Sequence, residues 1–407
     1  MAEVTNYIDR LVAELCPDGV EYRSLESLGK RNKGTAITAS KMRSLEPGNK
    51  DLRIFAAGST FVDTDSSNIP AKDILHGPAI IVKSRGYIGF EYYEKSFTHK
   101  NEMWSYTLDS NIVNQKFIYY YLLTQAYYLQ ELARSKSVKL PQLSVKDTDS
   151  LEVPVPPMEV QEAIVEILDK FTNLEAELEA ELEAELEART LQYGYYRDSL
   201  FEALDCPRVP LGSFARLVRG SGMPKTDFSE SGVGAIHYGQ IYTKFGTATA
   251  EVIAHVPEDK AKKLAVVNPG DVIVANTSEN LEDVCKAVAW VGDSDIVTGG
   301  HATVIKAPEQ NAKFISYYMA TGQFNKDKRR HAFGTKVIDV APKNLAKIEF
   351  PLPPLEEQQR IVDILDRFDA LTSSLSEGLP AELAARRSQY EYYRDQLLTF
   401  PRKGENQ

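Results

Sequence analysis

The stretch LEVPVPPMEVQ at residues 151–161 returns as IEFPLPPLEEQ at residues 348–358, at a constant offset of 197 residues. Each copy leads into a long helical pattern that ends on the same tetrad, YYRD, at residues 195–198 and 392–395. A duplication that spans half of the chain predicts an internal pseudo-twofold. A protein with that symmetry suits a partner that is itself read in two halves.

The length and composition bound the class of protein. A chain of 407 residues is expected to form more than one domain, and its 43% hydrophobic and 10% aromatic content is typical of a globular protein. The absence of an 18-residue apolar stretch excludes a membrane-spanning helix, and we expect no secretory signal in the first residues. Cys16, Cys206 and Cys285 show no metal or redox spacing, which indicates a reducing cytoplasm.

The net charge of −11 is unevenly distributed along the chain. Lysines and arginines exceed aspartates and glutamates by three in residues 16–150 and by two in residues 205–350. Residues 151–204 alone carry a net charge of −11. The net negative charge of the chain therefore comes mainly from the helical modules. The two mildly basic segments are separate candidates for binding nucleic acid.

Both modules are predicted to be long helices. The first pattern runs from Met158 to about Leu204 with Gly194 as its one helix-weakening residue, which corresponds to roughly 70 Å of helix. A helix of that length without an internal cap is expected to be a coiled-coil partner, and its mate is the second module. In that second module Gly378 and Pro380 predict a kink or a break.

Leucines recur every four residues through both modules, most regularly in the Leu-Glu-Ala-Glu tract at residues 174–186. One interpretation is a solvated helix built from strong helix formers. The other is a ruler, because one added tetrapeptide would lengthen the helix by about 6 Å, or one to two base pairs of DNA. The spacer stripe consists of Leu174, Leu178, Leu182, Leu186, Leu371, Leu375, Leu379 and Leu383.

The segments outside the modules are predicted to mix strands and helices. Short β-branched runs at residues 79–83 and 271–275 indicate strands, and residues 116–121 and 313–318 indicate helices whose aromatic residues belong to the core. The predicted fold class is α/β (α+β), with two similar α/β domains separated by two long antiparallel helical coiled-coil spacers. The expected parts are an N-terminal helix at 1–15 that completes the C-terminal half, a first domain at 16–157, a central helical spacer at 158–204, a second domain at 205–354 and a C-terminal helical spacer at 355–407.

These motifs together resemble the specificity subunit of type I restriction–modification enzymes. The marks of the resemblance are the twice-repeated Pro-Pro-x-x-x-Gln, the Ile-Val-x-Ile-Leu-Asp sequence at residues 164–169 and 361–366, and the YYRD tetrads. The sequence GSGMPK at residues 220–225 is also similar to the early Gly-x-x-Pro turn of that family's recognition domains.

The resemblance implies two target-recognition domains, each reading one half of a split sequence in double-stranded DNA. It implies that the helical modules set the gap between the half-sites and dock two modification (methyltransferase) subunits, through which restriction subunits join. It also implies a non-catalytic chain, with S-adenosylmethionine, ATP and magnesium expected only in the partner subunits.

The motif search agrees with a chain that lacks catalysis of its own. The sequence contains no Gly-x-x-x-x-Gly-Lys-Ser/Thr phosphate loop, no Gly-x-Gly-x-x-Gly fingerprint and no Asn-Pro-Pro-aromatic tetrad. Its six histidines lack the spacing of metal ligands, so we expect no metal site.

DNA contact requires cations for phosphates and bidentate groups for base edges. Basic clusters beside glycine and serine offer such groups in both domains, with Arg85 and Arg219 favoured for base or phosphate contact and Arg329 and Arg330 for phosphate contact. The candidate DNA-binding residues are Lys33, Lys41, Arg43, Lys83, Arg85, Lys136, Lys139, Arg219, Lys225, Gln240, Tyr242, Arg329, Arg330 and Lys336.

Two other classes of function remain open at this level. The leucine stripes and the acidic helix would equally suit a pseudo-symmetric protein–protein scaffold without base readout. A standalone nuclease or methyltransferase is disfavoured by the missing motifs.

Overall fold

The computed structural model describes residues 2–45, 50–137 and 139–404, and the side chains of these apart from residues 2–6, 372–377, 379 and 380. The chain forms two compact units, one of Met1–Ala180 with Ala381–Gln407 and one of Glu181–Pro380. Each unit contains one domain built on two sheets, together with segments of the two long helices α6 (Met158–Glu202) and α13 (Leu355–Leu397).

The domain of the first unit has two four-stranded sheets, in the orders β2-β9-β6-β7 and β4-β3-β8-β5. The second sheet contains one parallel pair, β3 with β8, and the other pairs of both sheets are antiparallel. The strands are β2 (Gly29–Lys33), β3 (Leu52–Phe55), β4 (Phe61–Thr64), β5 (Leu75–His76), β6 (Ala79–Lys83), β7 (Gly89–Tyr93), β8 (Ser96–His99) and β9 (Trp104–Leu108), and the helices are α2 (Ala39–Arg43), α3 (Gln115–Thr124), α4 (Ala126–Lys136) and α5 (Val145–Asp149).

Strand β6 lies at the centre of this domain, and its first four residues are apolar and buried. Ile80 and Val82 belong to the core shared with helices α3 and α6, whereas Ala79 and Ile81 pack against Phe97 of the second sheet. Successive side chains of a strand point to opposite faces, so a strand covered on both faces is apolar at every position. The result is a three-layer order of helices, first sheet and second sheet.

The domain of the second unit repeats this topology. Its sheets have the orders β12-β21-β17-β19-β14 and β15-β13-β20-β16, and β13 pairs parallel with β20 as β3 does with β8. The strands are β12 (Arg216–Arg219), β13 (Val233–Ile236), β14 (Ala248–Thr249), β15 (Ala254–Val256), β16 (Ala265–Val267), β17 (Val272–Ala275), β18 (Thr277–Ser278), β19 (Ala287–Trp290), β20 (Ile296–Thr298), β21 (Ala302–Lys306) and β22 (Ile338–Asp339), and the helices are α7 (Leu211–Phe214), α8 (Tyr238–Thr243), α9 (Glu258–Ala261), α10 (Ala312–Met319), α11 (Gly322–Lys328) and α12 (Pro342–Leu345).

Each domain closes at its base with a short ribbon of antiparallel strands. In the first unit β1 (Glu21–Ser24) pairs with β10 (Glu152–Val155), and in the second β11 (Arg208–Pro210) pairs with β23 (Glu349–Pro351). The repeated proline-rich motif thus forms the last strand of each domain and leads directly into a long helix. The predicted fold class of two similar α/β domains and two long antiparallel helices is confirmed.

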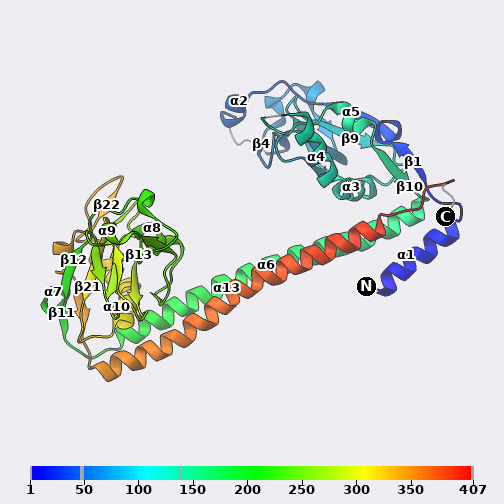
Figure 1. Cartoon of the computed structure of the whole chain (residues 1–407). Coiled ribbons are helices and arrows are strands. Elements are labelled where there is room, and N and C mark those ends of the chain that lie inside the picture. Colours follow the sequence, from blue (N-terminus) through cyan, green and yellow to red (C-terminus); the bar gives the residue numbers. More distant parts are fainter. Residues whose placement is uncertain (1, 46–49, 138, 405–407) are drawn as a thin grey trace. The chain divides into compact units, whose positions relative to one another are not determined.

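Within each unit, segments of α6 and α13 lie side by side in opposite directions (Figure 1). In the first unit Phe171 contacts Tyr390, with ring centroids 6.4 Å apart, and Arg387 forms an ion pair with Glu175 at 2.8 Å. In the second unit Tyr196 stacks on Phe368 at 5.5 Å.

Of the kink or break predicted at Gly378 and Pro380, the break is excluded, because α13 is one continuous helix from Leu355 to Leu397. A proline inside a helix removes one backbone hydrogen bond. The residues on both sides of Pro380 remain helical, so the loss does not end the element.

The spacer leucines do not form a uniformly buried seam. Leu174 and Leu371 are 60% and 62% exposed, and Leu178, Leu182, Leu186 and Leu383 are half-buried. Leu375 and Leu379 lie outside the described side chains. A four-residue step exceeds the 3.6-residue turn of a helix, so the stripe drifts around the helix and each leucine meets a different environment.

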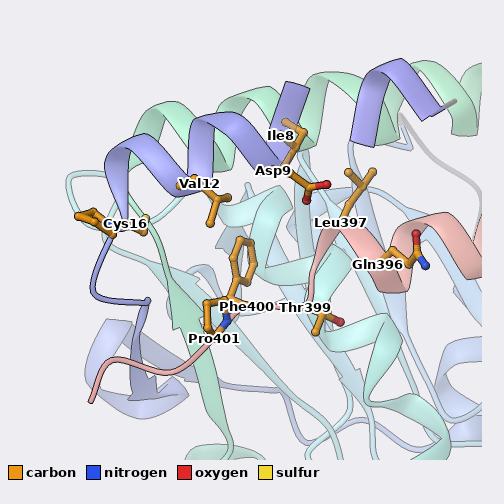
Figure 2. A pocket seen from close by; sticks show the side chains of 11 residues that line it. Ile8, Asp9, Val12, Cys16, Gln396, Leu397, Thr399, Phe400 and Pro401 are labelled. Carbon is orange, nitrogen blue, oxygen red and sulfur yellow. The ribbon is translucent and has the colours of Figure 1, made fainter. Parts of the chain in front are cut away.

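The N-terminal helix α1 (Ala2–Leu15) packs against the end of α13 in the first unit. Figure 2 shows Ile8 and Val12 of α1 on the side that faces Leu397 and Phe400. The following segment is fixed by the backbone, since Val20 accepts from Lys403 at 3.0 Å. The N-terminal segment therefore joins the C-terminal residues in one core of the first unit.

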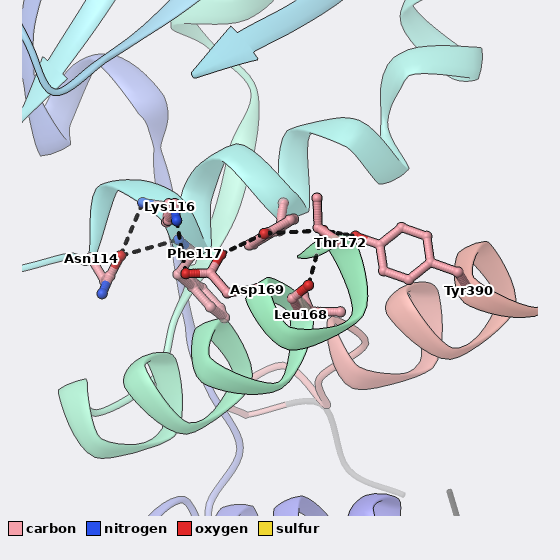
Figure 3. A network of polar contacts seen from close by, with 8 residues as sticks. Asn114, Lys116, Phe117, Leu168, Asp169, Thr172 and Tyr390 are labelled. Atoms are coloured by element: carbon pink, nitrogen blue, oxygen red, sulfur yellow. Dashed lines mark hydrogen bonds and ion pairs between the residues drawn. The ribbon is translucent and has the colours of Figure 1, made fainter. Parts of the chain in front are cut away.

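Each domain is fastened to its long helix by the same polar network. In the first unit Lys116 forms a 2.7 Å ion pair with Asp169, which also accepts from the Tyr120 hydroxyl at 2.6 Å (Figure 3). In the second unit Lys313 and Tyr317 bind Asp366 at 2.6 and 2.8 Å. Burial together with these hydrogen bonds to a carboxylate raises the pKa of both tyrosines.

The two networks differ where Thr172 of the first module is replaced by Asp369 in the second. Thr172 lies 3.4 Å from the hydroxyl of Tyr120, and Asp369 accepts from the Tyr317 hydroxyl at the same distance. Burial raises the pKa of Asp369. The second unit therefore places two carboxylates beside one tyrosine, whereas the first has only one.

Candidate nucleic-acid interface

In the second unit, loops from three strands gather at one end of the first sheet. Arg219 at the end of β12, Thr303 on β21 and Val274 on β17 lie in register across the sheet. The Arg219 side chain is half exposed. The end of this row therefore brings a half-exposed guanidinium next to the loops that leave β17 and enter β21.

Buried Asn276 connects the loop after β17 to β21 and to the segment at Val340 through hydrogen bonds. Its side chain accepts from the Thr303 hydroxyl at 2.6 Å and donates to the Val340 carbonyl at 2.7 Å. Its backbone N–H donates to His301 at 2.7 Å, and its carbonyl accepts from Val340 at 3.0 Å. All the polar groups of Asn276 are used inside the protein, so its role is to position its neighbours.

The segment before Val340 carries a carboxylate toward Arg219. Asp339 exchanges backbone hydrogen bonds of 2.8 and 3.0 Å with Phe333, and β22 pairs with β18. Its Oδ1 lies 3.7 Å from Nη2 of Arg219. The loop between Phe333 and Asp339 also exposes Lys336.

Glycines allow the close approach that sets Arg219 in place. A Cβ on Gly220 would lie 1.9 Å from the carbonyl oxygen of Gly299, so only glycine fits there. Gly300 then donates to the Gly222 carbonyl at 2.7 Å, which stacks the 220–225 turn on the loop before β21. The turn presents Lys225 to solvent.

The first unit has the same arrangement with other side chains. Gly34 follows Lys33 at the end of β2, and a Cβ there would meet the His99 carbonyl oxygen at 2.1 Å. Leu143 donates to the Ser84 carbonyl at 2.9 Å, as Val340 does to Asn276, and Arg85 bridges to Gln142. By these backbone pairs Gln142 of the first unit corresponds to Asp339 of the second.

The candidate residues predicted from the sequence divide into three groups. Those at the loop ends of the first sheets and on the loops and helix ends beside them are Lys33, Lys83, Arg85, Lys136, Lys139, Arg219, Lys225, Arg329, Arg330 and Lys336. Of these, Lys83, Lys136, Arg219 and Arg330 form ion pairs with Glu91, Asp147, Asp339 and Asp327. Lys41 and Arg43 lie instead on α2, which packs through Met42 on the second sheet.

Two of the predicted residues are already engaged inside the protein. Gln240 accepts from the backbone of His237 at 2.8 Å as part of a capping box, and the Tyr242 hydroxyl donates to the Thr277 carbonyl at 2.8 Å. Tyr242 thereby supports the segment after β17, whereas Gln240 caps helix α8. A contact with DNA would require them to exchange these bonds.

Residues that the sequence reasoning missed are Asn276, Asp339 and Gln142. The search favoured cations, so an amide and a carboxylate at corresponding positions gave no signal. Gln142 and Asp339 keep the offset of 197 residues that relates the modules, but the turn after the first strand does not: Lys33-Gly34 corresponds to Arg219-Gly220 at an offset of 186.

Buried His99 gives this region of the first unit a pH dependence. Its ring contacts the Lys100 carbonyl and the Ser105 hydroxyl, each at 3.2 Å, and burial lowers its pKa to about 4. An unfolded histidine titrates near 6.5, so as pH falls below 6.5 the unfolded chain binds a proton that the folded chain does not. We expect the free energy of unfolding to fall by about 2 kcal/mol between pH 7 and pH 5 from this group.

The measurement is urea unfolding of a Trp290→Phe background, in which Trp104 reports the first unit. His99→Gln should remove most of this pH dependence, whereas His76→Gln, at an exposed ring, should retain it. An equal slope in the His99 and His76 variants would contradict the assignment.

The comparisons with known proteins define the class of this protein. Residues 17–188 and 209–385 each match the family model of the type I restriction modification DNA specificity domain. The chain therefore belongs to the family of type I restriction–modification specificity subunits, and it contains two copies of the family's DNA specificity domain.

Individual relatives agree with this assignment. The chain is 32% identical over 334 residues to the EcoR124I/EcoR124II type I restriction enzyme specificity subunit of Escherichia coli, a match that covers 78% of each chain. Its fold is similar to that of a chain from a structural study of complex assembly and conformational transition in the type I R-M system, with a TM-score of 0.68, 15% identity and coverage of 93% and 97%. It is also similar to the HsdS subunit of Thermoanaerobacter tengcongensis, with a TM-score of 0.52, 14% identity and coverage of 96% and 98%.

Neither a membrane span nor a metal cluster was found in the part of the chain that the structure describes. No helix there has the length and apolar character to cross a bilayer. No group of three or more histidine, cysteine, aspartate or glutamate side chains there is arranged to hold a metal ion.

Proposed function

We propose that each domain reads one half of a bipartite sequence in double-stranded DNA and that the long helices set the gap between the half-sites. The observation that carries this proposal is the repeated loop cluster at the end of the first sheet. Lys33 and Arg85 in one unit and Arg219 in the other project from backbone that is fixed by hydrogen bonds. Lys336 is exposed on the loop whose ends, Phe333 and Asp339, are hydrogen-bonded to each other. Cations on a rigid base can neutralise phosphates and present donors to base edges.

The distribution of charge also supports DNA binding by the domains and not by the long helices. The two domain segments are mildly basic, and the segment of the first long helix carries a net charge of −11. An acidic helix repels the DNA backbone, so contact with DNA is directed to the domains. Its exposed leucines and tyrosines leave it suited to binding protein.

The modification subunits are the partners that we assign to these helices. Two copies would dock, one for each repeat of the helical module, and restriction subunits would join through them. In this proposal the chain itself does no chemistry, and S-adenosylmethionine, ATP and magnesium act in the partner subunits. The cellular location that fits such a complex is the cytoplasm, where it would meet its DNA substrate.

Selection from a random DNA library by the complex with modification subunits tests the proposal. We expect the selected sequences to share two short half-sites at a fixed gap, and binding to weaken steeply as salt rises. The complex without this chain is the control. A helical scaffold without base readout would give no shared bipartite sequence, and that result would refute the proposal.

A further inference from the structure

We infer that Arg219 and Asp339 read one G·C base pair together in the half-site of the second domain. This inference deepens the proposed function and rests on it. It begins from an incomplete contact: Oδ1 of Asp339 is buried and has no hydrogen-bond partner among the described residues. The nearest cation, Nη2 of Arg219, lies 3.7 Å away, beyond hydrogen-bond length.

A buried carboxylate oxygen that accepts no hydrogen bond lowers the stability of the fold, so its presence at Asp339 needs an explanation. The backbone gives Asp339 little freedom to relieve the cost, because it is hydrogen-bonded to Phe333 in both directions and paired with β18. Arg219 is held in turn by its pairing with Thr303 and by the glycine turn that follows it. The two side chains therefore lie beside each other on two fixed strands, and both reach solvent, since Arg219 is 50% and Asp339 35% exposed.

The charges of Arg219 and Asp339 favour a base edge over a phosphate as their ligand. A phosphate bound to Arg219 would also face the Asp339 carboxylate and be repelled by it. The major-groove edge of a G·C pair instead presents the acceptors N7 and O6 of guanine beside the N4 donor of cytosine. Arginine is the usual bidentate partner of guanine and aspartate accepts from cytosine N4, so the two side chains match the two bases of one pair.

The corresponding position in the first domain carries a different side chain. Gln142 occupies the place of Asp339 in the backbone pairing, and it is exposed. Glutamine makes a bidentate contact with adenine, not with cytosine. The same scaffold therefore offers different base preferences in its two copies, as a chain that reads two unlike half-sites requires.

The test uses the complete chain with its modification subunits and a DNA library randomised in both half-sites. We expect Arg219→Ala and Asp339→Ala to reduce discrimination at one and the same base pair of the second half-site, each by roughly 5- to 100-fold. Arg219→Lys keeps the positive charge but not the planar fork, so it should retain binding while losing preference for guanine. Asp339→Asn should shift the preference at that pair toward adenine.

Gln142→Ala is the matched control, and it should alter only the first half-site. Two results would overturn the inference. One is an unchanged second half-site in Asp339→Ala and Asp339→Asn, which would make Asp339 a structural partner of Arg219. The other is full preference for guanine in Arg219→Lys. Failure of the wild-type complex to select any bipartite sequence would instead refute the proposed function itself.

Discussion

Replacing Gln358 with leucine is expected to lower the free energy of unfolding of the second unit by about 2–5 kcal/mol. The side chain is fully buried at the start of α13. Its oxygen accepts from the backbone of Asn311 at 3.0 Å, and its nitrogen donates to the Pro353 carbonyl at 2.9 Å. Leucine fills a similar volume but leaves the buried Pro353 carbonyl and the partly buried N–H of Asn311 unpaired.

The expected loss is measured by urea unfolding in a Trp104→Phe background, where Trp290 reports the second unit. Gln359→Leu is the matched control, because the neighbouring side chain is exposed and its loss should cost little. Gln161→Leu should produce the same loss in the first unit, followed by Trp104. A loss below about 1 kcal/mol for Gln358→Leu would show that these groups find other partners.

This buried glutamine explains why the Pro-Pro-x-x-x-Gln motif could be recognised from the sequence. Gln161 accepts from the backbone of Asn114 at 2.7 Å and donates to the Pro156 carbonyl at 2.7 Å, as its counterpart does in the second half. The motif joins the last strand, the long helix and the N-terminus of α3 or α10. These two contacts span 47 and 5 residues in both halves of the chain, so the repeat preserves their spacing and makes the motif visible in the sequence.

The central strands and the aromatic helices were predictable for a similar reason. Strands β6 and β17 are apolar at nearly every position because both of their faces are covered. Phe117 and Phe314 are buried, as their place in helical patterns predicted. The positions of these strands and helices follow from the apolar residues within them, so they could be predicted without knowing the lengths of the loops.

The loop ends of the sheets were less predictable, because they depend on pairing between distant segments. Lys328 stood in the same basic run as Arg329 and Arg330, yet it is buried and donates to the carbonyls of Glu282 and Val284 at 2.7 and 2.8 Å. A residue's type does not reveal which backbone carbonyls approach it. The interface could therefore be predicted as a set of basic loops but not residue by residue.

Deleting Leu178 to Glu181 is expected to change the gap between the half-sites while both half-site sequences stay the same. The deletion removes one tetrapeptide from α6, which shortens this helix by about 6 Å and turns its end by about 40°. Since the helix lies in the sequence between the two recognition domains, the preferred gap should shorten by one to two base pairs. Affinity for the original site should fall by at least tenfold.

The measurement is selection from libraries in which the gap is varied and both half-sites are held constant. A chain with Glu177→Gln and Glu183→Gln is the control, since it alters two exposed positions of the tract without changing its length. It should keep the original gap. An unchanged gap in the deletion, or a new half-site sequence at the original gap, would show that α6 does not measure the distance. The tract would then be a solvated helix, which is the other interpretation that its sequence allows.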